Sequence, residues 1–178
     1  PGLDEDDRSL HRALVELTVA APVGDLIDIG SGQGRILKLL ASRAQRAVGV
    51  DIDSNARRFA RAELLLAGLP NCTLRQGDMY ELPFPDGEFD TIILDDVLSN
   101  AERPTAVLDE ARRLLRPGGR LLLLASVDAG AVSQLAQHFA KWCALTGLRL
   151  AAPRRIPAKN PRWLLAVATA AIDETAAA

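Results

Sequence analysis

Short apolar segments alternate with amphipathic segments along almost the whole chain, and this alternation limits the fold to few classes. Five segments are rich in Val, Ile and Leu and are short enough for buried strands: residues 25–29, 47–50, 72–75, 89–94 and 120–125. The intervening segments repeat apolar residues every three or four positions, which is the period of a helix face. Strands that alternate with helices form a parallel sheet with helices on both faces, so we predict an α/β fold.

Two of the expected helices have recognisable ends. Ser54 is the expected N-cap of a helix over Ser54–Leu66, and Gly68 stands where a C-cap glycine belongs. Another helix begins at Pro104, and Pro117-Gly118-Gly119 should end it sharply.

The last part of the chain departs from the alternation of strands and helices. Residues 148–156 and 163–169 are both apolar, and only a short turn at Lys159-Asn160-Pro161 separates them. That is too little chain for a helical crossover, so the two segments should form an antiparallel hairpin.

One domain accounts for this whole pattern. The acidic residues 1–8 are expected to form a flexible N-terminus, residues 9–170 the folded domain and residues 171–178 a C-terminal tail. Within the domain, the first helix should begin at Ser9 and the last should cover residues 131–146.

The composition excludes several classes of function. Lys and Arg total 21 and Asp and Glu total 23, and the formal net charge of -2 argues against binding nucleic acid by bulk electrostatics. No apolar run approaches the roughly 18 residues that span a bilayer, and no signal peptide opens the chain. Cys72 and Cys143 form neither a metal-binding nor a disulfide pattern, so we expect a cytoplasmic protein without a metal site. Because the chain starts at Pro1, its N-terminus is expected to be processed or to continue a longer protein.

A glycine-rich turn follows the first expected strand, in the order Asp28, Gly30, Gly32 and Gly34. In an open parallel sheet, ligands bind beyond the carboxyl ends of the strands. Glycines at that place let the backbone approach a ligand, and the next helix directs its N–H groups at the same ligand. We therefore expect a ligand site at this turn.

Acidic residues stand at three further strand ends: Asp51, Asp78 and the pair Asp95-Asp96. The number of residues between the glycines and Asp51 is typical of a carboxylate that accepts hydrogen bonds from ribose hydroxyls. Asp78 could accept a hydrogen bond from an exocyclic amine such as adenine N6. The neighbouring apolar residues Ile52 and Met79 are suited to holding a flat base between them. The pattern therefore indicates a ligand that contains adenosine.

Several adenosine ligands are excluded by departures from their motifs. A dinucleotide fingerprint requires glycine where Arg35 stands, and a P-loop requires Lys and then Ser or Thr after Gly34. The single tyrosine, Tyr80, has no Lys four residues later, so the Tyr–Lys pair of short-chain dehydrogenases is missing. A pyrophosphate would be repelled by Asp28, whereas an ammonium group would suit that position.

Six segments, in this order and spacing, resemble the motifs of class I S-adenosylmethionine-dependent methyltransferases. They are Asp28-Ile-Gly-Ser-Gly-Gln-Gly34, Val50-Asp51-Ile-Asp53, Gln76-Gly77-Asp78-Met79, Leu82-Pro-Phe-Pro-Asp86, Phe89-Asp90-Thr-Ile-Ile and Leu115-Arg-Pro-Gly-Gly-Arg-Leu121. The similarity is closest to the small-molecule group known as methyltransferase type 11, with its ubiquinone/menaquinone-biosynthesis relatives. It covers nearly the whole chain, residues 9–170.

The resemblance implies a Rossmann-like, doubly wound sheet of seven strands, mostly parallel with an antiparallel last strand. It also implies S-adenosylmethionine as the cofactor and S-adenosylhomocysteine as the product. The first motif would hold the methionine end, Asp51 the ribose, and Asp78 with the Met79 N–H the adenine. The cofactor-binding residues carried over from the family are Asp28, Gly30, Ser31, Gly32, Gln33, Gly34, Asp51, Ile52, Asp78, Met79, Leu94 and Asp95.

Asp95 and Asp96 are the candidate catalytic residues, because either carboxylate could orient or deprotonate an acceptor while positioning supplies most of the rate. The alternative is that one contacts the cofactor and the other caps a turn. A metal role for the pair, as in catechol-type methyltransferases, lacks a supporting cluster of acids. Family members often carry His where Ser99-Asn100 stands, and His11 and His138 are expected to be surface or packing residues.

A minimal core favours a methyltransferase that acts on a small molecule by in-line displacement. An aromatic content of 4% predicts an acceptor pocket that is aliphatic, incomplete, or completed by a chain segment outside this sequence. A basic patch beside Trp163 keeps an RNA, DNA or protein acceptor open, although charges also protect sheet edges. The patch consists of Arg154, Arg155, Lys159 and Arg162. A third alternative is a non-catalytic domain that senses S-adenosylmethionine. The oligomeric state stays open between monomer and dimer.

Overall fold

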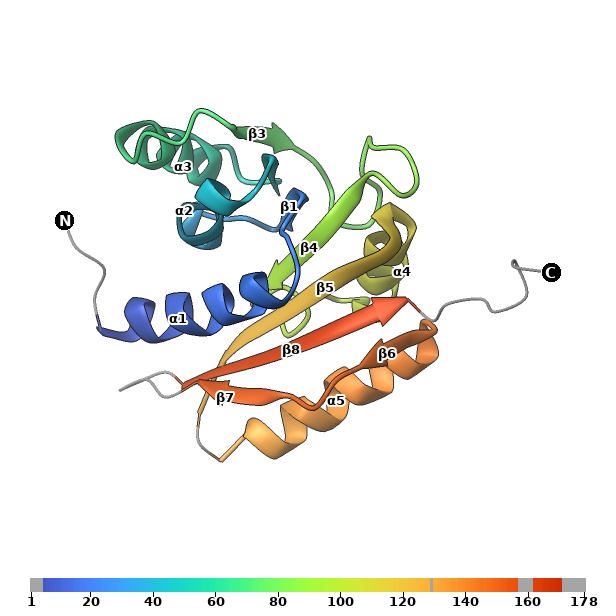
Figure 1. Cartoon of the computed structure of the whole chain (residues 1–178). Coiled ribbons are helices and arrows are strands. Elements are labelled where there is room, and N and C mark those ends of the chain that lie inside the picture. The colour runs from blue at the N-terminus through green and yellow to red at the C-terminus, as the bar shows by residue number, and fades with distance from the viewer. Residues whose placement is uncertain (1–4, 129, 157–161, 171–178) are drawn as a thin grey trace.

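The computed structural model describes residues 5–128, 130–156 and 162–170, which contain one eight-stranded sheet with helices on both faces (Figure 1). The strands are β1 (Asp25–Ile29), β2 (Arg46–Asp51), β3 (Cys72–Gln76), β4 (Phe89–Asp95), β5 (Leu115–Val127), β6 (Leu148–Leu150), β7 (Arg154–Ile156) and β8 (Arg162–Ala170). The helices are α1 (Glu5–Ala20), α2 (Arg35–Leu40), α3 (Ser54–Leu66), α4 (Pro104–Leu114) and α5 (Val132–Leu145), with a 3-10 turn at Ala41–Arg43.

The strand order is β3-β2-β1-β4-β5-β8-β6, and β7 also pairs with β8. Strands β1 to β5 pair in parallel, whereas β8 runs antiparallel to β5, β6 and β7. This arrangement confirms the predicted α/β sheet, mostly parallel with an antiparallel last strand. Because β1 lies between β2 and β4, the strand order reverses there, and the carboxyl ends of these strands meet at one edge.

The sheet has one more strand than the seven predicted. We expected a single strand over residues 148–156, but the structure divides it into β6 and β7. Pro153 stands in the gap and has no N–H to donate to the ladder, which explains the interruption. Both pieces pair with β8, so the expected antiparallel hairpin is present. Its turn at Lys159-Asn160-Pro161 lies outside the described residues.

Two helices begin differently from the prediction. Helix α1 begins at Glu5 rather than Ser9. Acidic residues favour the first turn of a helix, so the acidic start of the chain is a helix signal over residues 5–8. Helix α3 is capped by Asp53 rather than Ser54, because Asp53 Oδ1 accepts a 2.8 Å hydrogen bond from the second helical N–H.

Glycines end or interrupt elements at two places. Gly68 follows α3 with a φ of +67°, the conformation expected of a C-cap glycine. Helix α4 ends at Leu114, before Pro117-Gly118-Gly119, and β5 starts at the next residue. The Pro-Gly-Gly segment lies within β5, where the register with β4 shifts between Phe89 and Thr91.

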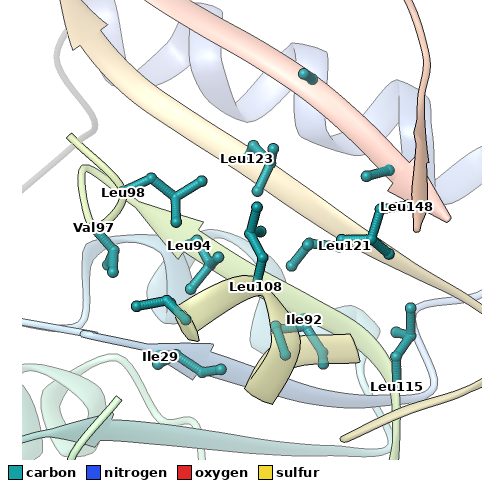
Figure 2. Close-up of a cluster of buried hydrophobic side chains, with 14 of the residues drawn as sticks. Ile29, Ile92, Leu94, Val97, Leu98, Leu108, Leu115, Leu121, Leu123 and Leu148 are labelled. Atoms are coloured by element: carbon teal, nitrogen blue, oxygen red, sulfur yellow. The ribbon is translucent and has the colours of Figure 1, made fainter. Parts of the chain in front are cut away.

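Two apolar cores lie on opposite faces of the sheet, because successive strand residues point to opposite sides. Ile92 and Leu94 of β4 belong to the core under α4 and α5, whereas Ile93 belongs to the core under α1 and α2. Figure 2 shows part of the first core, where Leu108 of α4 lies against strand residues such as Leu123. Packing on both faces holds the strands rigidly, so the carboxyl ends of the strands are also fixed in position.

Charged side chains join the strands at the opposite, amino edge of the sheet. Arg116 donates hydrogen bonds to Asp90 at 2.6 Å and to Asp25 at 3.0 Å. Arg46 contacts Asp25 at 3.5 Å and Glu88 at 2.8 Å. Single exposed ion pairs contribute little, but this network connects the starts of β1, β2, β4 and β5.

Arg120 of β5 holds the C-terminal end of α1. Its Nη1 donates to the carbonyl oxygen of Leu17 at 2.9 Å. Its Nη2 donates to the carbonyl oxygens of Ala21 at 2.9 Å and Pro22 at 3.1 Å. A cation at this end satisfies carbonyl groups that have no partner within the helix. None of the helices in the described part of the chain is long and apolar enough to cross a membrane.

Replacing Arg120 by Met should lower the free energy of unfolding by about 1–3 kcal/mol, because three backbone carbonyls lose a charged donor. The amide hydrogens of α1 should exchange faster with solvent, while those of β4 keep their protection. Urea unfolding and hydrogen exchange measure the two effects. If the α1 amides stay as protected as in the wild type, Arg120 does not cap the helix.

Candidate functional site

A pocket of about 440 Å³ opens beyond the carboxyl ends of β1, β2 and β3, at the switch point of the sheet. It is lined by Ile29, Gly30, Val50, Asp51, Ile52, Gly77, Asp78, Met79, Tyr80, Asn100 and Glu102. Five of the residues predicted for cofactor binding therefore surround one pocket. They are Gly30, Asp51, Ile52, Asp78 and Met79.

Ile52 and Met79 give the pocket apolar surfaces from two different strand ends. Ile52 directly follows β2 and is 70% exposed, whereas Met79 is packed partly against the core. A large aliphatic side chain that stays exposed beside a pocket is available to cover an apolar ligand surface.

Six lining residues were not among the predicted binding residues. Ile29, Val50 and Gly77 stand within the quoted motifs, whereas Tyr80, Asn100 and Glu102 lie outside them. Tyr80 is held by Arg103. The guanidinium carbon of Arg103 lies 4.3 Å from the ring centroid, and its backbone N–H donates to the phenol oxygen at 3.3 Å. Asn100 and Glu102 lie on the loop between β4 and α4. Their place shortly after a strand end is the one sequence signal that could have identified them.

Asp51 is oriented by two backbone N–H groups. Oδ2 accepts a 2.7 Å hydrogen bond from Gly32, and Oδ1 accepts a 2.8 Å hydrogen bond from Asp53. A carboxylate offers about four lone-pair sites, so each oxygen can still accept a hydrogen bond from a ligand hydroxyl. The bond to Gly32 also ties the glycine turn to the end of β2.

The glycine turn crosses the end of β2. The N–H groups of Gly30 and Ser31 both donate to the carbonyl oxygen of Val50, at 2.8 and 2.9 Å. Gly32 has a φ of +50°, and a Cβ atom there would meet no heavy atom within 4 Å. The turn therefore has an open side at Gly32, which any other residue would strain and partly fill.

Asp28 is a buried acid beneath this turn. Its side chain is 1% exposed, and Oδ1 has no hydrogen-bond partner among the described residues. Burial raises the pKa of Asp28 well above its usual value; Asp95 and Asp51 raise it further, and Arg35 opposes them. A buried carboxyl oxygen without a partner is unfavourable on its own, so the position fits a cationic group of a ligand.

Asp95 ends β4 and forms an ion pair with Arg35, the first residue of α2. The Nη2–Oδ2 distance is 2.7 Å, and the same guanidinium stacks on the Trp163 ring at 4.1 Å. Burial raises the pKa of Asp95, and Arg35 opposes the rise. In the described part of the chain, Oδ1 of Asp95 is buried without a partner. Arg35 thus places a positive charge beside Asp95 at the site. In the sequence, this residue is notable only because it stands where a dinucleotide motif requires glycine.

Asp96 has different surroundings from Asp95. Its two carboxylate oxygens accept hydrogen bonds from the Ser126 N–H at 2.7 Å and the Ser126 hydroxyl at 2.8 Å. Its φ is +56°, and its carbonyl oxygen accepts a 2.6 Å hydrogen bond from the Asn100 amide. These contacts fit the turn-capping role that we considered for one member of the pair.

Other predicted cofactor residues lie outside the lining of the pocket. Leu94 is buried in the core shown in Figure 2, so only its backbone is available to a ligand. Gln33 is exposed on the glycine turn, and Gly34 lies close to Ala60 of α3. The hydroxyl of Ser31 is buried and has no hydrogen-bond partner within the described residues.

The basic patch predicted near the last strand is only partly described. Arg154 pairs with Glu16 of α1 at 2.9 Å, and Arg155 is exposed. Lys159 and the side chain of Arg162 lie outside the described part of the chain. The described basic residues therefore add no support to a nucleic-acid interface.

Residues 27–123 match a family model described as a methyltransferase domain. The chain belongs to the class I S-adenosylmethionine-dependent methyltransferases. The matched segment of this methyltransferase domain runs from β1 into β5 and includes the glycine turn, Asp51, Asp78 and Asp95. The family expected from the sequence motifs, and with it the cofactor of that family, is confirmed.

The methyltransferase domain is 37% identical over 122 residues to a ubiquinone/menaquinone biosynthesis C-methyltransferase, UbiE, of Paraburkholderia phymatum. The match covers 65% of this chain and 50% of the relative, and the chain spans half or less of the curated relatives it matches.

Two solved structures resemble the domain over almost its full length. A SAM-dependent methyltransferase from Aquifex aeolicus has a TM-score of 0.77 at 16% identity, with 93% of each chain covered. The N-methyltransferase NodS of Bradyrhizobium japonicum, in complex with S-adenosyl-L-homocysteine, has a TM-score of 0.77 at 19% identity. That match covers 93% of this chain and 87% of NodS. At these identities, the two structures show the fold alone.

Replacing Asp28 by Asn should raise the free energy of unfolding at neutral pH by about 1–2 kcal/mol, because the variant no longer buries an ionisable group that lacks a partner. Since the pKa of Asp28 is raised in the folded state, the wild type loses stability as the pH rises from the ordinary carboxyl pKa through the raised value. The difference in stability between the two proteins should therefore widen over the range of pH above the ordinary carboxyl pKa of about 4. Urea unfolding over this range measures it, and a constant difference would contradict the raised pKa.

Proposed function

We propose that this domain transfers a methyl group from S-adenosylmethionine to a small-molecule acceptor by in-line displacement. The observation that carries the proposal is the pocket at the carboxyl edge, where the oriented carboxylate of Asp51 lies beside the apolar Ile52 and Met79. The relatives support it, because one is named a C-methyltransferase and a structural neighbour is a complex with S-adenosyl-L-homocysteine.

The residues of the pocket fit the adenosine end of the cofactor. Asp51 would accept hydrogen bonds from the ribose hydroxyls, and Asp78 from the adenine amine. Ile52 and Met79 would hold the base between apolar surfaces. A volume of about 440 Å³ lies within the range of small-molecule sites.

The residues beneath the glycine turn fit the methionine end. Oδ1 of Asp28, which has no hydrogen-bond partner among the described residues, offers a buried acceptor to an ammonium group. The open side of Gly32 leaves room for the methionine part of the cofactor beside the turn. When bound, the cofactor supplies a methyl group that is already activated by its sulfonium. The domain itself contributes binding, orientation and the exclusion of water.

Asp95 is the residue that we propose to orient the acceptor. One of its oxygens is held by Arg35, whereas the buried Oδ1 has no partner among the described residues. Burial raises the pKa of Asp95, which suits a group that accepts a hydrogen bond or a proton from a nucleophile. Asp96 is bound to Ser126 through both oxygens, so we propose that it shapes the turn instead.

A hollow of about 320 Å³ beyond the end of β5 has both polar and apolar lining residues and offers a place for part of a small acceptor, although Asp95 is not among its lining residues. It is lined by Ser99, Ser126, Val127, Asp128, Ala131, Gln134, Leu135 and His138. Ser99 borders this hollow while the next residue, Asn100, lines the cofactor pocket, so the loop after β4 separates the two spaces. The lining is more polar than that of an aliphatic pocket, one of the forms expected from the composition.

The similarity to the C-methyltransferase UbiE favours carbon as the acceptor atom. The assay is therefore a panel of phenols, quinols, amines and carbon acids, incubated with S-adenosylmethionine. Mass spectrometry detects the net gain of one CH2 unit that results when a methyl group replaces a proton. Product from any member supports an enzyme with a small acceptor. Binding of the cofactor without product from the panel favours the sensing domain, and methylated RNA or protein in a parallel incubation favours the macromolecular alternative.

Replacing Asp51 by Ala should raise the Kd for S-adenosylmethionine about tenfold or more, because two hydrogen bonds from ribose to a charged acceptor are lost. Isothermal calorimetry measures the change. Asp53→Ala is the matched control two residues later, since Asp53 caps α3 and does not line the pocket. It should cost about 1 kcal/mol of stability and leave the Kd within about twofold. Wild-type affinity in Asp51→Ala would show that the ribose site is misplaced.

A further inference from the structure

Helix α4 holds the segment that follows β3. Glu110 of α4 is 9% exposed, and its Oε1 accepts a 2.7 Å hydrogen bond from the N–H of Leu82. Arg113 donates to the carbonyl oxygens of Leu82 at 3.1 Å and Phe84 at 2.8 Å. It also donates to the carboxylate of Asp86 at 2.7 Å. Two side chains of α4 therefore satisfy backbone groups along this segment.

Glu110 and Arg113 also bind each other. Arg113 Nε donates to Oε2 of Glu110 at 2.9 Å, and Nη2 donates to Oε1 at 2.7 Å. Such a two-point pair is planar and rigid. Arg113 lowers the pKa of Glu110, so the pair stays charged at neutral pH. The segment is thus attached to a preformed unit rather than to mobile side chains.

The same segment begins with residues that line the cofactor pocket, and the backbone of these residues makes few hydrogen bonds to other described residues. Gly77 donates to the carbonyl oxygen of Asp51 at 3.4 Å, a long hydrogen bond. Asp78 makes one isolated bridge with Glu81, and its Oδ1 accepts a 3.0 Å hydrogen bond from the N–H of Tyr80. These hydrogen bonds are internal to the segment or weak. Because Leu82 and Phe84 are buried in the core, packing holds their side chains, and the hydrogen bonds from α4 fix the backbone of the segment.

The loop that leads into α4 contributes to the same pocket. Arg103, which precedes α4, contacts the ring and the phenol oxygen of Tyr80. Asn100 and Glu102, from this loop, line the pocket together with Tyr80. Helix α4 is therefore connected to the segment after β3 and to the loop after β4, which together surround the proposed adenine position.

We propose that Glu110 and Arg113 are positioning residues for the adenine end of the cofactor, and that they act through residues 78–84. The inference rests on the proposed function, because it assumes that an adenosine ligand occupies the pocket. Neither side chain lines the pocket itself. Loss of the pair should weaken every ligand that contains adenosine, whether or not it carries the amino acid.

The experiment measures binding of two ligands by calorimetry, S-adenosylhomocysteine and 5′-methylthioadenosine, which lacks the amino acid. Arg113→Ala should raise both Kd values by the same factor, about fivefold to tenfold, because the segment after β3 loses its fixed position. Arg113→Lys should give a smaller rise, since Lys keeps a charged donor but not the planar fork. Asp28→Asn should give the complementary pattern, with only S-adenosylhomocysteine weakened.

Arg112→Ala is the matched control on the same helix. Arg112 donates to the carbonyl oxygen of Thr146 at 3.3 Å, away from the segment after β3. This variant should lower the melting temperature and leave both Kd values within about twofold. Glu110→Gln, which keeps an acceptor for the Leu82 N–H but loses the ion pair, is measured as well and serves in place of Arg113→Ala if that variant does not fold.

The outcomes separate this inference from the proposed function. Equal rises in both Kd values, with thermal unfolding showing a folded variant, support the inference. Unchanged affinity for 5′-methylthioadenosine in folded Arg113 and Glu110 variants overturns the inference and leaves the proposed function intact. A loss confined to S-adenosylhomocysteine also overturns it, because the effect then lies at the methionine end. A wild-type domain that binds neither ligand overturns both.

Discussion

Burial of an acidic side chain at the centre of a parallel sheet is the constraint on which the rest of the structure depends. The pairing of β1 with β2 and β4 places Asp28 between Gly49 and Ile93, where it is 1% exposed. Burial raises the pKa of Asp28, and the acids at the neighbouring strand ends raise it further. An isolated domain would be more stable without this group, so its presence indicates a position built for a ligand.

The interactions that offset this burial lie away from the site. Two apolar cores cover the faces of the sheet, and ion pairs centred on Arg116 and Arg46 connect the strands at the amino edge. At the carboxyl edge, Arg35 compensates Asp95 directly, and Trp163 of β8 holds the guanidinium in place. The residues of the amino-edge network do not line the pocket, so substitutions there should change stability and leave the pocket intact.

Sequence reasoning predicts the residues that directly follow a strand. Asp51 and Asp78 were identified in this way, and the structure places both around one pocket with Ile52 and Met79. The alternation of short apolar and amphipathic segments also predicted the parallel sheet, and the short stretch between the last two apolar segments predicted their antiparallel pairing. These features depend on local pattern and on the general geometry of parallel sheets.

The residues that sequence reasoning missed reach the site from distant parts of the chain. Glu102 enters the pocket from the loop after β4, and Arg35 meets Asp95 across 60 positions of sequence. Glu110 contacts Leu82 across 28 positions, so no helical or strand period can reveal the pair. Such contacts appear only when the packing of α2 and α4 against the sheet is known.

A crystal structure of the domain with S-adenosylhomocysteine tests the central claim most directly. We expect the adenine between Ile52 and Met79, the ribose hydroxyls within hydrogen-bond distance of Asp51, and the ammonium group at the buried oxygen of Asp28. A ligand that lies elsewhere on the sheet, or that leaves Asp51 and Asp28 without contacts, would contradict the assignment of this pocket.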